Sequence, residues 1–392
     1  METIVKHAQG LVYALLHLMP SSYQHESLRS VLGLFLEAQG HPLPQHCQTK
    51  SASALSRFFN HYQWSTRAVL RTTRQRVLQQ IAAHAPRPDS SLKVLIDLTT
   101  LEKCGKFRQL SDPTENETVP NPWVRVLNSK RGLHIVVLYL LVGQWRVPWS
   151  FCLWHGKGSA SPAQLACKLL YRVPKPLTQR YRVMVLADTE FGTVEFLTAV
   201  HKRRWRAVVG MRGTRLMETG QSLKSLYHHG TRGQQVRLVG LDVPLTVSWF
   251  WLKRSDGKRE LRFVVSTYPD SGVYLVRLGR QRWAIEGFFK TIKHRFGLHC
   301  FGQKTRLGIY RWLLLSLIAY LLAHWVSRTF PNWWRLDWGE VSAQAIAELL
   351  PQVLWIKRLH QIQKHRKLAD DLGFEILVKP LPLACRANAY VS

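Results

Sequence analysis

Acidic residues are scarce in this chain of 392 residues. It holds 24 Asp and Glu against 55 Lys and Arg, which gives a formal net charge of +31 with neutral histidines. A folded protein that tolerates so much self-repulsion is expected to have a polyanionic partner. Nucleic acid is the first candidate and an anionic membrane surface the second.

Cysteine spacings typical of disulfide-rich or zinc-binding proteins are also missing. The six cysteines form no CxxC pair and no Cys/His pair at zinc-ligand spacing; they lie at positions 47, 104, 152, 167, 300 and 385. This excludes a disulfide scaffold and a zinc module. The N-terminus also lacks a signal-peptide pattern, so we expect a cytoplasmic protein that associates with the nucleoid.

Apolar runs are too short to cross a bilayer. The strongest candidate, Trp312 to Val326, offers about 15 residues where about 20 are needed, and it contains His324. We therefore expect a buried helix there and no membrane partner.

Hydrophobic residues make up 46% of the chain, which is too many for a disordered polycation. At about 100–200 residues per domain, the length predicts two or three domains. We expect a helical DNA-binding region over residues 1–88, a catalytic domain over 89–330 with a β insertion at about 211–270, and a helical tail over 331–392 that serves in dimerisation.

The order of elements indicates the fold class. Apolar runs and caps predict strands at 92–96, 134–142 and 145–151, a helix at 161–170, a strand at 182–187, a helix at 193–203 and a strand at 207–210. Further strands are predicted at 235–239, 246–252 and 261–266, followed by helices at 271–297 and 312–326. This order is that of an α/β, ribonuclease H-like core with an inserted β subdomain.

Two of these strands are expected to end on an aspartate, Asp97 and Asp188. Taken singly, such residues are more often turn formers or helix caps. Carboxylates at the ends of neighbouring strands can converge, however, and they repel each other unless a cation lies between them. Oxygen ligands of this kind select Mg²⁺, or Mn²⁺ in its place, and a third acid would complete a two-ion site for phosphodiester chemistry.

Glu286 is the candidate for the third acid. The predicted helix buries one face, made of Ile285, Phe288, Phe289, Ile292 and Phe296. The opposite face carries Arg282, Glu286, Lys290 and Lys293. One carboxylate among cations suits a metal ligand flanked by phosphate-binding side chains, and the same spacing also fits a plain salt-bridge network.

The segment from Arg282 to Lys293 resembles the signature of the DDE transposases of bacterial insertion sequences, in the hairpin-forming, cut-and-paste family with a β insertion before the glutamate. That pattern reads Tyr, two residues, Arg, three residues, Glu, six residues, Lys. Arg282, Glu286 and Lys293 match in register, while Gly279 stands at the tyrosine position. The resemblance covers about residues 90–330.

The resemblance implies a two-metal endonuclease and strand transferase that binds the ends of its own element as a homodimer. Asp97, Asp188 and Glu286 would be catalytic and hold two Mg²⁺ ions. Arg282 and Lys293, with Lys290 as the weaker candidate, would bind DNA phosphates. In that family, tryptophans of the β insertion stack on a flipped base, for which Trp249 and Trp251 are the candidates here.

Basic residues surround the proposed site. Residues 201–300 contain 20 Lys and Arg against 6 Asp and Glu, and Arg280 lies within this stretch. Arg67, Arg71 and Arg74 share one face of a predicted N-terminal helix and are candidates for contacts to the DNA ends.

Three functions fit these features: a transposase, a metal-dependent DNA endonuclease without strand transfer, or a catalytically inactive DNA-binding derivative. The presence of all three acids argues against the last.

Overall fold

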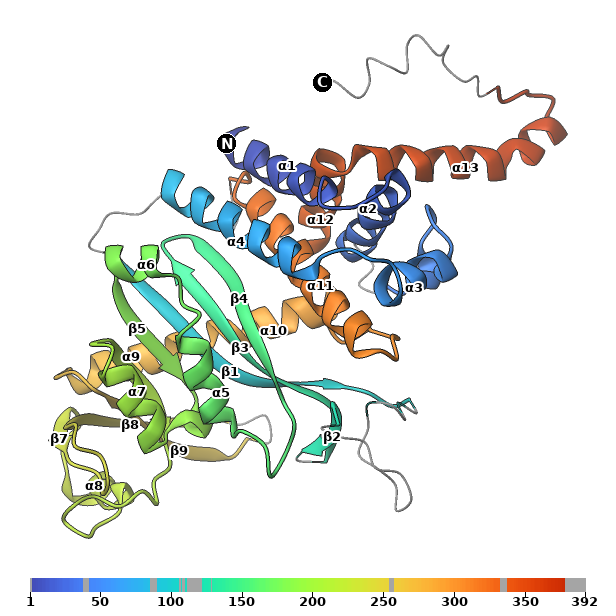
Figure 1. Ribbon diagram of the computed structural model, residues 1–392. Helices are drawn as coiled ribbons and strands as arrows, with labels where there is room; N and C mark the ends of the chain where they lie inside the picture. Colours follow the sequence, from blue (N-terminus) through green and yellow to red (C-terminus); the bar gives the residue numbers. More distant parts are fainter. Residues whose placement is uncertain are drawn as a thin grey trace, which may run out of the picture.

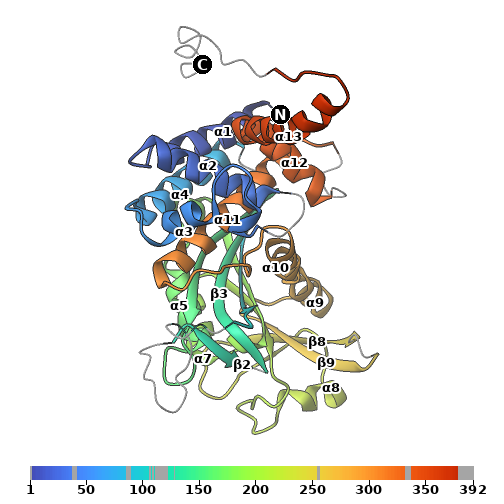
Figure 2. The ribbon, with the colours of Figure 1, turned by 90° about the vertical axis from the view of Figure 1, so that its right-hand side faces the viewer.

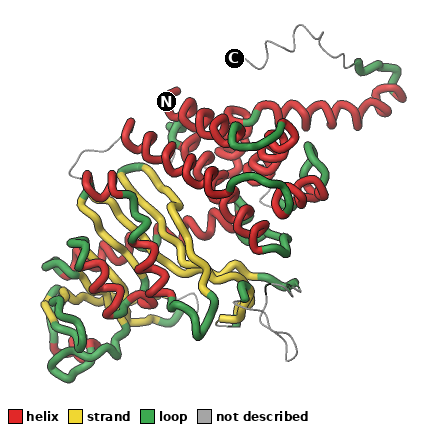
Figure 3. Tube along the Cα trace, viewed as in Figure 1, coloured by secondary structure: helices red, strands yellow, loops and turns green. Residues whose placement is uncertain are grey.

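One large mixed β-sheet forms the centre of the molecule, and a bundle of helices covers one end of it (Figures 1 and 3). The computed structural model describes residues 2–37, 42–84, 90–105, 107, 110, 122–127, 129–253, 257–331 and 337–377. Within them the sheet has nine strands: β1 (Ser91–Glu102), β2 (Val124–Leu127), β3 (Lys130–Val142), β4 (Trp145–Trp154), β5 (Arg182–Ala187), β6 (Arg206–Met211), β7 (Gln234–Val236), β8 (Leu245–Lys253) and β9 (Arg259–Ser266).

The strand order combines antiparallel and parallel pairs. The path is β2-β3-β1-β5-β6-β9-β8-β7, and β4 pairs with β3. The β1, β3 and β4 pairs are antiparallel, whereas β1–β5 and β5–β6 are parallel. The strands expected in a β insertion continue this sheet, because β9 pairs with β6. The chain is therefore a mixed α/β protein.

Helices cover both faces of the sheet (Figure 2). On one side lie α5 (Pro162–Leu170) and α7 (Val194–His201), and on the other α9 (Gly272–Gln281) and α10 (Ala284–His294). The remaining helices of the sheet region are the short α6 (Lys175–Arg180) and α8 (Leu226–His229). The start of α5 is fixed by a capping box between Ser161 and Gln164, as the Ser-Pro pair predicts.

The strands predicted at 134–142 and 145–151 are confirmed as β3 and β4, which form a hairpin through Gly143 at φ +54°. The prediction for the first strand was wrong in one respect: β1 does not end at Asp97 but continues to Glu102. The reason is that β1 has two neighbours. Its parallel pairing with β5 stops at Ile96, but the antiparallel pairing with β3 continues for another six residues.

The helix predicted over 271–297 is broken into α9 and α10. At Arg282 to Glu286 the backbone N–H groups bond three residues back, as from Trp283 to the Arg280 carbonyl and from Glu286 to the Trp283 carbonyl. This tighter turn redirects the chain. It turns Arg282 toward the sheet, so the expectation that Arg282 lies on the solvent face was wrong; its side chain is 13% exposed.

The helical bundle combines both ends of the chain. It contains α1 (Glu2–Leu16), α2 (Ser22–Leu36), α3 (Ala52–Asn60), α4 (Thr66–Ala83), α11 (Arg306–Ser327), α12 (Trp338–Leu349) and α13 (Pro351–Asp371). Residues 85–89, which include the expected boundary after residue 88, lie outside the described residues, as do residues 332–336 and 378–392 of the expected tail. The domain boundaries stay predictions.

Helix α11 is the centre of this bundle. By length and composition alone it could cross a membrane, but 83% of its most apolar 18-residue window is buried inside the protein, as the sequence predicts. Arg311 on α11 is itself buried and donates to the backbone carbonyls of Phe58, Phe59 and Trp64, at 2.9 to 3.2 Å. These bonds tie the N-terminal helices to the helix that packs on β4.

His324 on α11 makes the fold sensitive to acid. Its Nε2 accepts the Arg146 backbone N–H at 3.1 Å, next to the β3–β4 turn. Burial, with the charges of Arg146 and Arg328, lowers the pKa of this imidazole to about 3. Because the unfolded chain protonates the same group near pH 6.5, acid favours unfolding between these two values.

We predict that His324 removes stability as pH is lowered from about 6.5 to about 3, by roughly 1.4 kcal/mol per pH unit from this group, while the raised pKa of Asp97 acts in the opposite direction between about 4 and 7. Urea unfolding of wild type and His324→Gln at several pH values would measure the His324 contribution as the pH dependence of the difference between the two proteins. An unchanged slope in the variant would contradict the assignment.

Candidate functional site

The three predicted acids come from three elements that meet at one point of the sheet. Asp97 lies in the middle of β1, one residue past the last pair with β5, Ile96 with Ala187. Asp188 directly follows β5, so the parallel register brings the two aspartates side by side. Glu286 stands in the first turn of α10, which packs on β1.

A single guanidinium joins these acids. Arg282 Nη1 donates to Asp97 Oδ2 at 3.0 Å, and Nη2 donates to Glu286 Oε1 at 2.8 Å. Its Nη2 also lies 3.9 Å from Asp188 Oδ1. The side chains of Asp97 and Arg282 are each 13% exposed, whereas Asp188 and Glu286 face solvent at 42% and 55%.

The charges of the site are strongly coupled. Burial raises the pKa of the Asp97 carboxyl to about 7, against the opposing charge of Arg282, and the neighbouring Asp188 and Glu286 add to the increase. Burial alone would lower the pKa of Arg282, but the three carboxylates outweigh it and raise that pKa. One guanidinium therefore faces three carboxyl groups.

The donor set suits a divalent ion by its chemistry, because three carboxylates offer hard oxygen ligands. The three carboxylates are not spaced to hold a metal ion, since no group of three or more His, Cys, Asp or Glu in the described part of the chain is arranged in this way. The guanidinium of Arg282 lies where the three carboxylates converge.

Lys293 ties the far end of α10 to β1. Its Nζ donates to Thr99 Oγ1 at 2.7 Å and to the Thr100 carbonyl at 2.8 Å. Lys290 and Arg280 are exposed, and Arg280 lies over the Phe250 ring at 5.7 Å. The two threonines were missed by sequence reasoning, although they follow Asp97 closely along β1.

A cleft of about 390 Å³ opens beside the acids, lined in part by Asp188, Glu286, Trp283, Phe250 and Gly279. The side chain of Trp283 is 41% exposed. At Gly279 a Cβ atom would lie 3.2 Å from Val264 Cγ2, because α9 packs closely on β9. This close approach explains why the small residue is accommodated at this position better than a tyrosine.

The tryptophans of the β insertion differ in exposure. On β8, Trp249 is buried at 5% and packs near Phe263, whereas Trp251 is 45% exposed. Burial makes Trp249 a core residue, and Trp251 is the one of this pair that an external ring could contact.

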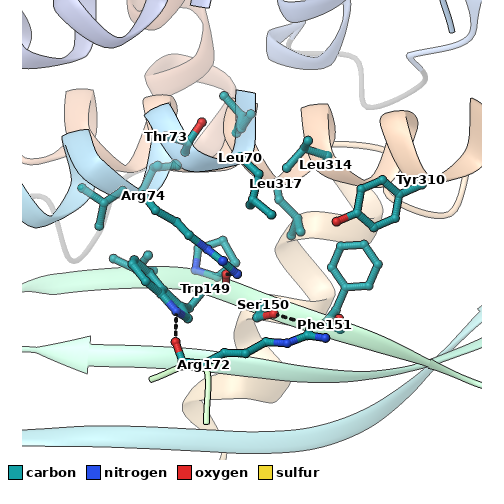
Figure 4. Close-up of a pocket in the computed structure, with 15 residues that line it drawn as sticks. Leu70, Thr73, Arg74, Trp149, Ser150, Phe151, Arg172, Tyr310, Leu314 and Leu317 are labelled. Atoms are coloured by element: carbon teal, nitrogen blue, oxygen red, sulfur yellow. Dashed lines mark hydrogen bonds between the residues drawn. The ribbon is translucent and has the colours of Figure 1, made fainter. Parts of the chain in front are cut away.

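The three N-terminal arginines do not form one exposed face. Arg67 and Arg71 on α4 are exposed. Arg74 instead turns into a cavity of about 230 Å³ between α4, β4 and α11 (Figure 4). There Arg74 Nη2 donates to the Trp149 carbonyl at 3.2 Å, and its guanidinium lies over the Trp149 ring at 5.1 Å.

Part of the chain is similar to a known protein family. Residues 128–322 match the family model "Transposase DDE domain". Just under half of the chain is therefore similar to a transposase DDE domain. The matched segment includes Asp188, Arg282, Glu286 and Lys293 and begins after Asp97, which lies on the neighbouring strand β1.

A curated relative points the same way. The probable transposase for insertion sequence element IS5377 of Geobacillus stearothermophilus is 26% identical over 113 residues, which is 24% of this chain and 30% of that protein. A solved structure, the piggyBac transposase synaptic complex with hairpin DNA, aligns with a TM-score of 0.46 at 12% identity, over 97% of this chain and 85% of that chain.

The position of Arg74 leads to a stability prediction. Arg74→Ala should lower the free energy of unfolding by about 1–3 kcal/mol, because the buried Trp149 carbonyl and ring lose their partner. Arg71→Ala, one turn earlier on the exposed side, should change it by less than about 0.5 kcal/mol. Equal losses in a urea titration would show that Arg74 is not held in this cavity.

Proposed function

We propose that this chain is a DNA transposase that cuts the ends of an insertion sequence by two-metal-ion chemistry and joins them to target DNA. The observation that carries the proposal is the convergence of Asp97, Asp188 and Glu286 on one cation within a chain of which just under half is similar to a transposase DDE domain. The net charge of +31 supports a DNA partner.

The core has a ribonuclease H-like arrangement in this proposal. Three antiparallel strands, β4, β3 and β1, followed by the parallel strands β5 and β6, support it. Crossover helices precede β5 and β6, as parallel pairs require. The two aspartates then stand on the central strands, where ligands of open α/β sheets bind.

The chemistry assigned to the site is phosphodiester cleavage and transfer. Asp97, Asp188 and Glu286 would hold two Mg²⁺ ions, or Mn²⁺ in their place, and bound ions of this kind activate the attacking oxygen and stabilise the leaving one. Water would attack the phosphodiester and release a 3′ hydroxyl, which would attack the opposite strand, close a hairpin and displace the 3′ oxygen of the flanking DNA. A second water would reopen the hairpin, and the restored 3′ hydroxyl would then attack a phosphodiester of target DNA. The hairpin step follows from the resemblance to the cut-and-paste family.

The protein's own residues bind and orient the DNA. Arg280 and Lys290 are exposed beside the site and are assigned to phosphate contacts, together with Arg282 and Lys293. Lys293 already holds Thr99 and Thr100, so it also positions the strand that carries Asp97. Trp251 and Trp283 offer exposed rings for stacking on unpaired bases.

Two copies are expected to act together, because two ends must be cut and joined. Helix α13 projects from the body of the protein (Figure 1) and supports this expectation. Its exposed apolar residues, Trp355, Leu359 and Ile362, recur at helical spacing and offer a surface for a second copy.

The test of the proposed function is cleavage of DNA carrying the inverted repeats that flank the gene. Wild type should cut these ends in Mg²⁺, and Asp97→Asn, Asp188→Asn or Glu286→Gln should each lower the rate by at least about 100-fold, since residues that merely support metal ligands cost about 10- to 100-fold. Glu190→Gln, two residues from Asp188, is the matched control and should keep activity. Cleavage that survives all three amide changes would refute the site, and cleavage without joining would make the protein a nuclease.

Arg67 and Arg71 should contribute to DNA binding through charge. The double variant Arg67→Ala, Arg71→Ala should weaken binding to duplex ends at low salt and reduce the slope of log affinity against log salt by about 2, because each lost phosphate contact removes about 0.9. Fluorescence anisotropy at several salt concentrations measures this slope. An unchanged slope would place the DNA elsewhere.

A further inference from the structure

The side chain of Arg282 has an unusual set of partners. Its contacts in the described structure are to carboxylates: Asp97 on β1, Asp188 after β5 and Glu286 on α10. Both terminal nitrogens donate to carboxylate oxygens, and neither donates to a backbone carbonyl of the described residues. The side chain of Arg282 therefore acts on the acids themselves, while its backbone forms the C-cap of α9.

The backbone around Arg282 is irregular. It stands between α9 and α10, where successive N–H groups bond three residues back instead of four. Such a stretch inside a helical segment is often a hinge. The next residue, Trp283, is 41% exposed, so the outer side of this turn faces solvent and the adjoining cleft. Arg282 lines this cleft together with Asp188 and Glu286, so its guanidinium lies within reach of a ligand bound in the cleft.

If divalent ions bind to these acids, electrostatic repulsion requires the guanidinium of Arg282 to move away from them. A guanidinium and a divalent ion repel each other, and the same carboxylate oxygens would serve both. A guanidinium that leaves needs another anion, and its planar fork matches the oxygens of a phosphate. DNA held against the site provides that phosphate.

We propose that Arg282 is an exchangeable counter-ion: it holds the three acids in the DNA-free protein and transfers to a DNA phosphate when divalent ions enter. This rests on the proposed function and adds a regulation to it. Divalent ions and DNA then bind cooperatively, because each favours the outward position of Arg282. The acids stay paired with the guanidinium until DNA is present.

The experiment is a calorimetric titration of the DNA-free full chain with Mn²⁺ and with Mg²⁺. Arg282→Gln removes the internal cation, and it should bind the ion at least about tenfold more tightly than wild type. Arg282→Lys, which keeps the charge, should stay close to wild type. Arg277→Gln is the matched control, because this exposed arginine on α9 lies over the Tyr274 ring at 5.2 Å and has no role in the site.

Thermal unfolding supplies a second readout. Without divalent ions, Arg282→Gln should melt at a lower temperature than wild type, because three carboxylates then repel each other uncompensated. Added Mg²⁺ should restore it and should raise the melting temperature of wild type much less. If the variant folds only with Mg²⁺, the midpoint of Mg²⁺-induced refolding takes the place of the calorimetric affinity.

A third arm repeats the titration in the presence of duplex DNA. DNA should tighten ion binding to wild type and have a smaller effect on Arg282→Gln. Equal or weaker ion binding by DNA-free Arg282→Gln would overturn the exchange, whatever the cleavage assay gives. Failure of wild type to cut its element ends would instead overturn the proposed function, even if the variant bound ions more tightly.

Discussion

Mutual repulsion of three carboxylates is the constraint on which the rest of this site depends. At an effective dielectric constant near 20, two unit charges 4 Å apart interact by about 4 kcal/mol, so acids gathered at one point need a cation. The protein provides one in Arg282, whose two terminal nitrogens reach three elements. Burial raises the pKa of Asp97 to about 7, against the opposing charge of Arg282. One guanidinium faces three carboxyl groups, and bound divalent ions would supply the further positive charge.

The fold serves this cluster by bringing distant segments into register. Parallel pairing of β1 with β5 sets Asp97 beside Asp188, and the break between α9 and α10 directs Arg282 inward. Lys293 fastens the other end of α10 to Thr99 and Thr100, so the helix that carries Glu286 is held at both ends. At the opposite end of the sheet, Arg311 joins the N-terminal helices to α11, which packs on β4.

Much of this could be predicted from the sequence, because local patterns determine it. The strand from 182 to 187, the helix after Ser161 and the buried aromatic face of α10 depend on periodicity and caps, and all three are confirmed. The errors arose where tertiary contacts decide. Pairing with β3 extends β1 past Asp97. A tight turn at Arg282 interrupts a helical pattern that is continuous in the sequence. Arg74 contacts the Trp149 ring and therefore does not share the exposed face of α4. The predicted roles of the site residues follow from chemistry and stay predictions.

The central claim is that Asp97, Asp188 and Glu286 bind divalent ions together, and metal-directed cleavage of the protein backbone tests it most directly. Fe²⁺ would replace Mg²⁺ in the presence of DNA and ascorbate, and mass spectrometry would locate the cuts made by radicals formed at the ion. The account predicts three clusters of cuts, in β1 near Asp97, after β5 near Asp188 and at the start of α10 near Glu286, all suppressed by excess Mg²⁺. Cuts confined to other segments, or cuts that persist in Asp97→Asn with Asp188→Asn, would contradict it.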